Sequence, residues 1–208
     1  MTIIQKIADH KVIAVIRLDD LSQAVQLSQA LIAGNVHILE FTLTNPDAAN
    51  TIATVREAVG EDGIIGAGSV ISVEQVELVA KRGAQFVVSP VTKRDVIEAC
   101  HKYALPTVPG AYTPTEIQTA WEMDVTAVKV FPAGRLGPGY IKDLLAPLPH
   151  LRLIPTGGIN GENIRDYIQT GVFAAGVGSA LFDTSDLLAG NWEAITKSAR
   201  ALVDAIQT

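Results

Sequence analysis

VIAVIR, residues 12–17, and ILEFTL, residues 38–43, flank the stretch DLSQAVQLSQALIAG, residues 20–34. The two flanking runs are short and rich in apolar and β-branched residues, which is typical of buried strands. The middle stretch repeats apolar residues such as Leu27 and Leu31 at helical spacing. The three segments therefore predict a strand–helix–strand unit in which the two strands are parallel.

The same alternation continues along the rest of the chain. Further apolar runs with strand character occur at residues 64–69, 86–90, 107–112, 127–132, 152–158 and 174–179. Helix starts are indicated by NPD (45–47), SVEQ (72–75) and TPTE (113–116), and helix ends by Gly34, Gly60, Gly83 and Gly171. Parallel strands alternating with helices, without a long insertion or a linker, predict a single (β/α)8 (TIM) barrel domain over residues 1–208, with a short N-terminal helix.

The composition narrows the class of protein. The 208 residues include 16 Lys and Arg against 22 Asp and Glu, a net charge of −6 that argues against nucleic acid and anionic membranes as partners. Cys100 is the single cysteine, which excludes an intramolecular disulfide, and the four scattered histidines form no metal-binding motif. Neither a signal-peptide pattern nor a bilayer-length apolar run is found, so we expect a cytoplasmic protein that needs no metal or other cofactor.

Polar residues interrupt the predicted strands near their carboxyl ends, where a (β/α)8 barrel carries its active site. Side chains alternate along a strand, which groups each polar residue with neighbours on one face. The groups are Arg17 with Ile13 and Val15, Glu40 with Ile38, Thr42 and Thr44, Ser69 with Ile65 and Ala67, and Lys129 with Ala127 and Phe131. We expect the charged residues to face the upper interior of the barrel, where water or a substrate can reach them.

Lys129 lies in the middle of the apolar run AVKVFP, residues 127–132. A buried ammonium group has to be paired, lose its proton or take part in chemistry. One interpretation is an ion pair with Glu40 that only fixes the strand register, although such pairs seldom add stability. The other is a lysine whose apolar surroundings favour the free amine, which attacks a carbonyl carbon to form a Schiff base while Glu40 moves the protons.

PTGG (155–158) and GVGS (176–179) end the last two predicted strands. Loops at these positions of a barrel often bind phosphate through backbone N–H groups, and glycine lets the backbone approach the anion closely. Either glycine pair alone could be an ordinary turn, but their joint position favours a phosphate site. The predicted phosphate-binding residues are Thr156, Gly157, Gly158, Gly178 and Ser179.

Several segments follow one another in order along nearly the whole chain: VIAVIR, LEFTLTNPDA, IIGAGSVISVEQ, FVVSP, VPGAYTPTE, VKVFPAG, GPGYIKDL, PTGGI and GVGSALF. In this order they resemble the class I aldolases that cleave 2-keto-3-deoxy-6-phosphogluconate (KDPG), also called 4-hydroxy-2-oxoglutarate aldolases. The resemblance implies a (β/α)8 barrel, a homotrimer, a phosphorylated keto-acid substrate and no metal.

The resemblance also implies roles for individual residues. Lys129 corresponds to the Schiff-base lysine of the family, and Glu40 corresponds to its acid/base glutamate. Ser69 stands where the family usually has threonine, and it keeps the hydroxyl group that helps to hold the keto-acid end of the substrate. Pro90, at the end of the fourth predicted strand, belongs to the same part of the site.

The substrate carboxylate has two possible partners in the family pattern. Some members carry an arginine four residues after the glutamate, where this chain has Thr44, and others carry one at the end of the first strand, where it has Arg17. We expect Arg17 to hold the carboxylate, because a guanidinium group matches a carboxylate in bidentate fashion. The alternative is a surface salt bridge from Arg17 to Asp19 or Asp20.

These residues predict the reversible aldol cleavage of KDPG to pyruvate and glyceraldehyde 3-phosphate, with 4-hydroxy-2-oxoglutarate as a further substrate. The galactonate epimer of KDPG is an alternative substrate, left open by GPGYIKDL (137–144) and by Thr44. A sugar-phosphate isomerase or epimerase is an alternative of another class, and it would not need Lys129. A catalytically inactive barrel that serves as a binding module is the third alternative.

Overall fold

Short parallel strands form the interior of the structure, a computed structural model that describes residues 2–207. The strands are β1 (Val12–Ile16), β2 (Ile38–Thr42), β3 (Ile64–Gly68), β4 (Val87–Val88), β5 (Thr107–Val108), β6 (Gly110–Ala111), β7 (Val128–Val130), β8 (Leu153–Pro155) and β9 (Ala175–Val177). One sheet has the order β5-β4-β3-β2-β1-β9 and a second has the order β6-β7-β8. An isolated parallel bridge between Thr156 and Gly176 links the end of β8 to β9.

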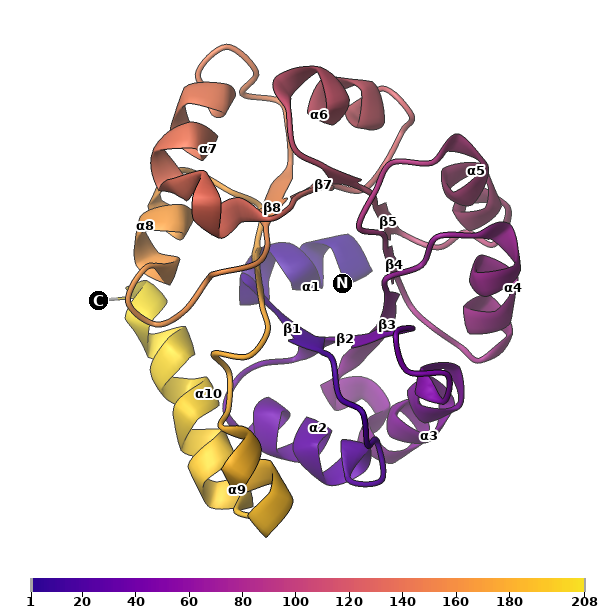
Figure 1. Ribbon diagram of the computed structural model, residues 1–208, viewed down its shortest axis with the longest axis vertical. Helices are drawn as coiled ribbons and strands as arrows, with labels where there is room; N and C mark the ends of the chain where they lie inside the picture. The colour runs from indigo at the N-terminus through magenta and orange to yellow at the C-terminus, as the bar shows by residue number, and fades with distance from the viewer. Residues whose placement is uncertain (1, 208) are drawn as a thin grey trace.

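Helices alternate with these strands and, apart from α1, surround them (Figure 1). They are α1 (Ile3–His10), α2 (Ala24–Ala33), α3 (Ala48–Val59), α4 (Val73–Lys81), α5 (Arg94–Lys102), α6 (Pro114–Trp121), α7 (Gly137–Leu145), α8 (Ile164–Gln169), α9 (Thr184–Ala189) and α10 (Trp192–Gln207), with short 3₁₀ turns η1 (Gly60–Asp62) and η2 (Ala133–Arg135). The predicted α/β class and the short N-terminal helix are confirmed. Within residues 2–207, none of the helices is both long and apolar enough to cross a bilayer.

Buried apolar side chains form two layers, one on each face of the strands. The outer layer packs between strands and helices and includes Val128 of β7 and Phe41 of β2. The inner layer fills the space that the strands enclose, and consists of Ile7, Ile13, Ile38, Ile64, Phe86, Val88, Val108, Ala127, Ile154 and Ala174. Ile7 belongs to α1, which lies at the centre of the ring of strands in Figure 1, so this helix closes one end of the interior.

The strand register brings the two buried charged residues to the inner face. Glu40 of β2 pairs with Val15 of β1 and Gly66 of β3, whereas Lys129 of β7 pairs with Gly110 of β6. Two residues before each of them, Ile38 and Ala127 belong to the inner layer. Because side chains alternate along a strand, Glu40 and Lys129 point to the same side, as predicted.

The strands end earlier than predicted, which changes the expectation for Ser69. Strand β3 ends at Gly68, and Ser69 has a left-handed backbone with φ of 57°. Ile65 and Ala67 pack in the outer layer against the helices. The grouping of Ser69 with these two residues on one strand face was therefore wrong, because the alternation of side chains stops before Ser69.

The predicted strand 107–112 is divided in two. Pro109 separates β5 from β6, because proline has no N–H group to donate to a neighbouring strand. Its carbonyl oxygen still accepts a hydrogen bond of 2.9 Å from the Lys129 N–H group. The two pieces thus contribute to different sheets.

Helix starts behave largely as the sequence predicts. Thr113 and Glu116 form a complete capping box at the start of α6, and the Ser72 side chain accepts a hydrogen bond from the Gln75 N–H group at the start of α4. Asp47 occupies the N-cap position of α3 without a side-chain cap hydrogen bond.

Candidate active site

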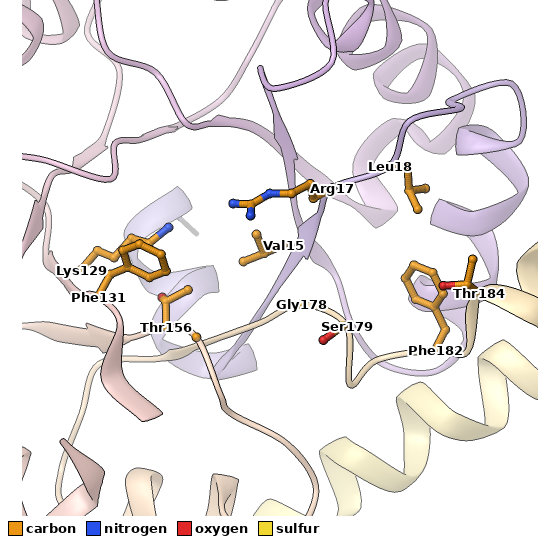
Figure 2. Close-up of a pocket in the computed structure, with 11 residues that line it drawn as sticks. Val15, Arg17, Leu18, Lys129, Phe131, Thr156, Gly178, Ser179, Phe182 and Thr184 are labelled. Carbon is orange, nitrogen blue, oxygen red and sulfur yellow. The ribbon is translucent and has the colours of Figure 1, made fainter. Parts of the chain in front are cut away.

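Lys129 lies at the centre of the candidate site. Strand β7 holds its backbone between Gly110 of β6 and Ile154 of β8. The residue is 6% exposed, and its ammonium group lies 5.1 Å from the centre of the Phe131 ring, in cation–π geometry. Figure 2 shows the side chain directed into a cavity. The lysine is therefore buried within the fold and still reachable from the cavity.

Glu40 is the acidic partner of this lysine. Its Oε1 atom lies 3.9 Å from Lys129 Nζ, a distance that allows Coulombic attraction and is too long for a hydrogen bond. Glu40 is 2% exposed, and within the described chain its Oε1 atom has no hydrogen-bond partner. Burial raises the pKa of Glu40 above its ordinary value, and the positive charges of Lys129 and Arg17 offset this only in part.

A cavity of about 290 Å³ opens above the lysine, at the carboxyl ends of β1, β7, β8 and β9. Six of the predicted site residues line it, namely Arg17, Lys129, Thr156, Gly157, Gly178 and Ser179. The cavity thus brings together predicted site residues as far apart in the sequence as Arg17 and Ser179.

Arg17 supplies a second positive charge to the cavity. It is exposed, and Figure 2 shows its guanidinium group directed toward the Lys129 ammonium group across the cavity. The ion pairs within residues 2–207 include Lys93–Asp95 and Lys129–Glu40, and none is observed between Arg17 and Asp19 or Asp20. Two cations facing one space create a local field that attracts an anion despite the net charge of −6.

The two glycine-rich loops meet beside this space. Gly157, with φ of 88°, has a backbone conformation that favours glycine, and its carbonyl oxygen accepts a 2.7 Å hydrogen bond from the Gly134 N–H group. The bridge from Thr156 to Gly176 holds the first loop next to the second, which contains Gly178 and Ser179. The loops therefore present backbone and a hydroxyl group to one side of the cavity.

A family model described as "Aldolase: KDPG and KHG aldolase" matches residues 3–198. The chain belongs to the KDPG and KHG aldolase family. The 2-dehydro-3-deoxy-phosphogluconate aldolase of Haemophilus influenzae is 35% identical to this aldolase over 206 residues, which cover 99% of this chain and 97% of that protein. The 2-dehydro-3-deoxy-6-phosphogalactonate aldolase of Escherichia coli is 35% identical over 171 residues, which cover 82% of this chain and 83% of that protein.

A solved structure of a relative holds a reaction intermediate. It is KDPG aldolase from Legionella pneumophila with pyruvate captured at low pH as a covalent carbinolamine intermediate. The two chains are 32% identical, the TM-score is 0.87, and the match covers 94% of this chain and 95% of that chain.

Five residues predicted for the site do not line the cavity of this aldolase: Glu40, Thr44, Ser69, Pro90 and Gly158. Glu40 lies behind the lining residue Lys129, with its Oε1 atom 3.9 Å from Lys129 Nζ. The Thr44 hydroxyl group shares a 2.9 Å hydrogen bond with that of Thr42. Ser69 is half-buried just beyond β3, and Gly158 lies next to the lining residue Gly157. Their roles toward a substrate stay predictions.

Other lining residues were missed as site residues. They are Val15, Leu18, Phe131, Phe182 and Thr184. Val15 and Phe131 could have been found from their strand faces, which they share with Arg17 and Lys129. Phe182 and Thr184 flank Asp183, which caps α9, and the helix-start pattern DTSD (183–186) was the available signal.

Proposed function

We propose that this chain is a class I aldolase that reversibly cleaves KDPG into pyruvate and glyceraldehyde 3-phosphate. It would also act on 4-hydroxy-2-oxoglutarate, giving pyruvate and glyoxylate. The observation that carries the proposal is the Lys129 amine, buried in a strand, open to a cavity and 3.9 Å from the Glu40 carboxyl group. The names of the curated relatives support the substrate class.

The first half of the reaction makes the Schiff base. The Lys129 amine attacks C2 of the keto acid and forms a carbinolamine. Glu40 donates a proton to the departing hydroxyl group, which leaves as water, and an iminium ion results. The raised pKa of Glu40 suits this step, because it keeps a proton available on a carboxyl group nearer to neutral pH.

The second half breaks the carbon–carbon bond. Glu40, acting through a water molecule, takes the proton of the C4 hydroxyl group. The C3–C4 electron pair moves toward the iminium nitrogen, which leaves an enamine and releases glyceraldehyde 3-phosphate. Glu40 then returns a proton to C3, and hydrolysis of the iminium frees pyruvate and the Lys129 amine.

The remaining site residues bind the two ends of the substrate. Arg17 would hold the carboxylate, helped by Thr44, Ser69 and Pro90 at the keto-acid end. At the other end, Thr156, Gly157, Gly158, Gly178 and Ser179 would bind the phosphate group. The placement of most of these residues around one cavity supports this division.

Chemical trapping tests the proposal at Lys129. Pyruvate with sodium borohydride should reduce the Schiff base to a stable adduct, which mass spectrometry of a digest locates on Lys129. Lys129→Ala should lose both the adduct and measurable cleavage of KDPG while it keeps a cooperative unfolding transition. Lys142→Ala is the matched control, because Lys142 is an exposed lysine of α7, and it should behave as the wild type.

Two results would contradict this assignment. The first is cleavage of KDPG by Lys129→Ala at the wild-type rate. The second is a wild-type protein that turns over a sugar phosphate without forming the pyruvate adduct, which would favour an isomerase or epimerase.

A second candidate substrate is the galactonate epimer of KDPG. The observation that favours it is the Escherichia coli phosphogalactonate aldolase, which is also 35% identical, over 171 residues as against 206 for the phosphogluconate aldolase from Haemophilus influenzae. A comparison of kcat/KM for the two epimers distinguishes the candidates, because both follow the same chemistry at Lys129 and Glu40.

We further propose that the two sheets form a single eightfold (β/α)8 barrel domain. In this arrangement β5 and β6 count as one strand interrupted at Pro109, and the Thr156–Gly176 bridge closes the ring between β8 and β9. The ring of strands in Figure 1 supports this proposal.

The assembly is proposed to be a homotrimer. Ile71, Val91 and Tyr112 are 48%, 46% and 38% exposed, and we call them the rim patch. Hydrogen bonds from Lys93 to the Ile71 carbonyl and from Thr92 to the Gly110 carbonyl hold their loops together. Exposed apolar side chains on segments that are linked in this way support contact with further copies of the chain.

A further inference from the structure

The Glu40 side chain lies against the backbone of Gly68 on the neighbouring strand. A Cβ atom added at Gly68 would lie 2.0 Å from Glu40 Oε1 and 2.6 Å from both Cδ and Cγ of the same side chain. These separations are far below any van der Waals contact. The carboxyl group of Glu40 therefore occupies the space that a side chain at position 68 would need.

The backbone of Gly68 does not itself require glycine. Gly68 is the last residue of β3, where it pairs with Thr42 of β2, and it is absent from the glycines with positive φ. Any residue with a side chain can adopt this extended backbone. The requirement at position 68 comes from space, and the group that fills this space is Glu40.

Packing rather than hydrogen bonding fixes the position of the Glu40 carboxyl group. Its Oε1 atom has no hydrogen-bond partner in residues 2–207, and the side chain is 2% exposed. Lys129 Nζ lies at 3.9 Å, beyond hydrogen-bond distance. A change in the wall beside Glu40 would therefore move the carboxyl group relative to Lys129.

We propose that Gly68 is a positioning residue, which leaves the space that holds the Glu40 carboxyl group at its working distance from Lys129. This inference rests on the proposed aldolase function. The atoms crowded by a side chain at position 68 belong to the end of a flexible side chain, so the fold can accept alanine if Glu40 rotates away. The effect of the substitution then falls on proton transfer and leaves substrate binding largely unchanged.

The test compares Gly68→Ala with Gly139→Ala, a control glycine of α7 with no atom within 4 Å of its added Cβ. For Gly68→Ala we expect kcat for KDPG cleavage to fall by roughly 100-fold, because misplacement by about 1 Å can cost on the order of 10²-fold. KM should change by less than about threefold, because Gly68 does not line the cavity that would bind the substrate. Exchange of the pyruvate methyl protons in D2O should slow in parallel with kcat, and borohydride should still trap pyruvate on Lys129.

A double-mutant cycle separates this role from a general packing defect. Gly68→Ala should lower Tm in the wild-type background and should not lower it in Glu40→Ala, where the crowded atoms are gone. If Gly68→Ala alone fails to fold, recovery of folding in the double variant supports the proposal. An equal loss of Tm in both backgrounds, or a double variant that also fails to fold, would overturn it.

The outcomes also distinguish this inference from the proposed function. A wild-type protein that does not form the pyruvate adduct refutes the function and the role of Gly68 with it. Wild-type kcat and methyl exchange in Gly68→Ala, with the adduct present in the wild type, refute only the role of Gly68.

Discussion

Two residues of opposite charge, Lys129 and Glu40, are almost completely buried here without a hydrogen bond between them. Removing both groups from water costs free energy that their attraction only partly offsets. A pair that served stability alone would be expected at hydrogen-bond distance. The separation of 3.9 Å and the open cavity above Lys129 fit a pair kept for proton transfer.

The pKa of Glu40 makes stability depend on pH. Burial raises this pKa above its ordinary value of 4.5, so the folded protein holds the proton more firmly than the unfolded chain does. The contribution of Glu40 to stability is therefore lost as the pH rises from about 4.5 through the raised folded-state pKa. We expect the free energy of unfolding of Glu40→Gln, relative to wild type, to increase over this window in urea denaturation at a series of pH values.

Glu116 provides a control, because its effect on stability should depend on pH in the opposite direction from that of Glu40. Hydrogen bonds from the N–H groups of Thr113 and Tyr112 lower its pKa, so its contribution is present above 4.5 and is lost as the pH falls through the lowered value. Relative to wild type, Glu116→Gln should become less stable as the pH rises toward 4.5. A flat Glu40→Gln difference between pH 4.5 and neutral pH would contradict the raised pKa.

At the residue scale, the sequence was informative where chemistry and strand position coincide. Lys129 and Glu40 were predicted because a charge within an apolar strand is costly, and the alternation of side chains placed both on the inner face. Gly68 and Phe182 were not predicted. Their significance depends on neighbours from distant segments, which one sequence does not reveal.

Helix α1 is short, but it closes the interior of the ring of strands. It spans Ile3–His10 and closes one end of the interior, and its residue Ile7 is 1% exposed among the inner-layer side chains. The sequence predicted a helix here. It did not predict the position of this helix at the base of the strands, because an amphipathic helix can pack against many different surfaces.

Truncation of Ile7 tests the contribution of α1. Ile7→Ala should lower the free energy of unfolding by about 2–5 kcal/mol, because the methyl groups removed leave a cavity in a packed layer. Leu188→Ala, at a side chain of similar size that is 76% exposed, should change it by less than about 0.5 kcal/mol. Chemical denaturation gives both values, and equal losses in the two variants would show that α1 does not seal the interior.

Strand ends were the elements least well predicted. The predicted strands 86–90 and 152–158 are shorter in the structure, as β4 (Val87–Val88) and β8 (Leu153–Pro155). The residues past these ends, Ser89–Pro90 and Thr156–Gly158, are polar, proline or glycine residues that belong to the loops above the strands. The order of strands and helices was more robust, since it depends on long periodic segments.

For the whole molecule, the family and the α/β class follow from many weak signals that agree. No single segment was specific, but the ordered segments extend along the chain and the family model matches residues 3–198. The contact surface between copies of the chain could not be predicted in this way, because the sequence does not show which apolar residues are exposed or which surface they contact. The rim patch became visible only when three separate loops were seen to be hydrogen-bonded together.

Assembly can be tested at the rim patch. In sedimentation velocity the wild type should behave as a trimer, and Val91→Glu should shift it toward smaller species, because an unpaired charge buried in a contact costs several kcal/mol. Leu188→Glu, outside the patch, should leave the trimer intact. A monomeric wild type, or a Val91→Glu protein that stays trimeric, would exclude the rim patch as the contact.

The Thr156–Gly176 bridge also has a consequence for ligand binding. The three-stranded and six-stranded sheets meet there through this bridge and a 2.9 Å hydrogen bond from the Phe173 N–H group to the Leu153 carbonyl oxygen, and the loops above carry Gly157 and Gly178. A phosphate group held by both loops would link the two sheets at this junction. Substrate would then add a further connection across the ring at the place where it binds.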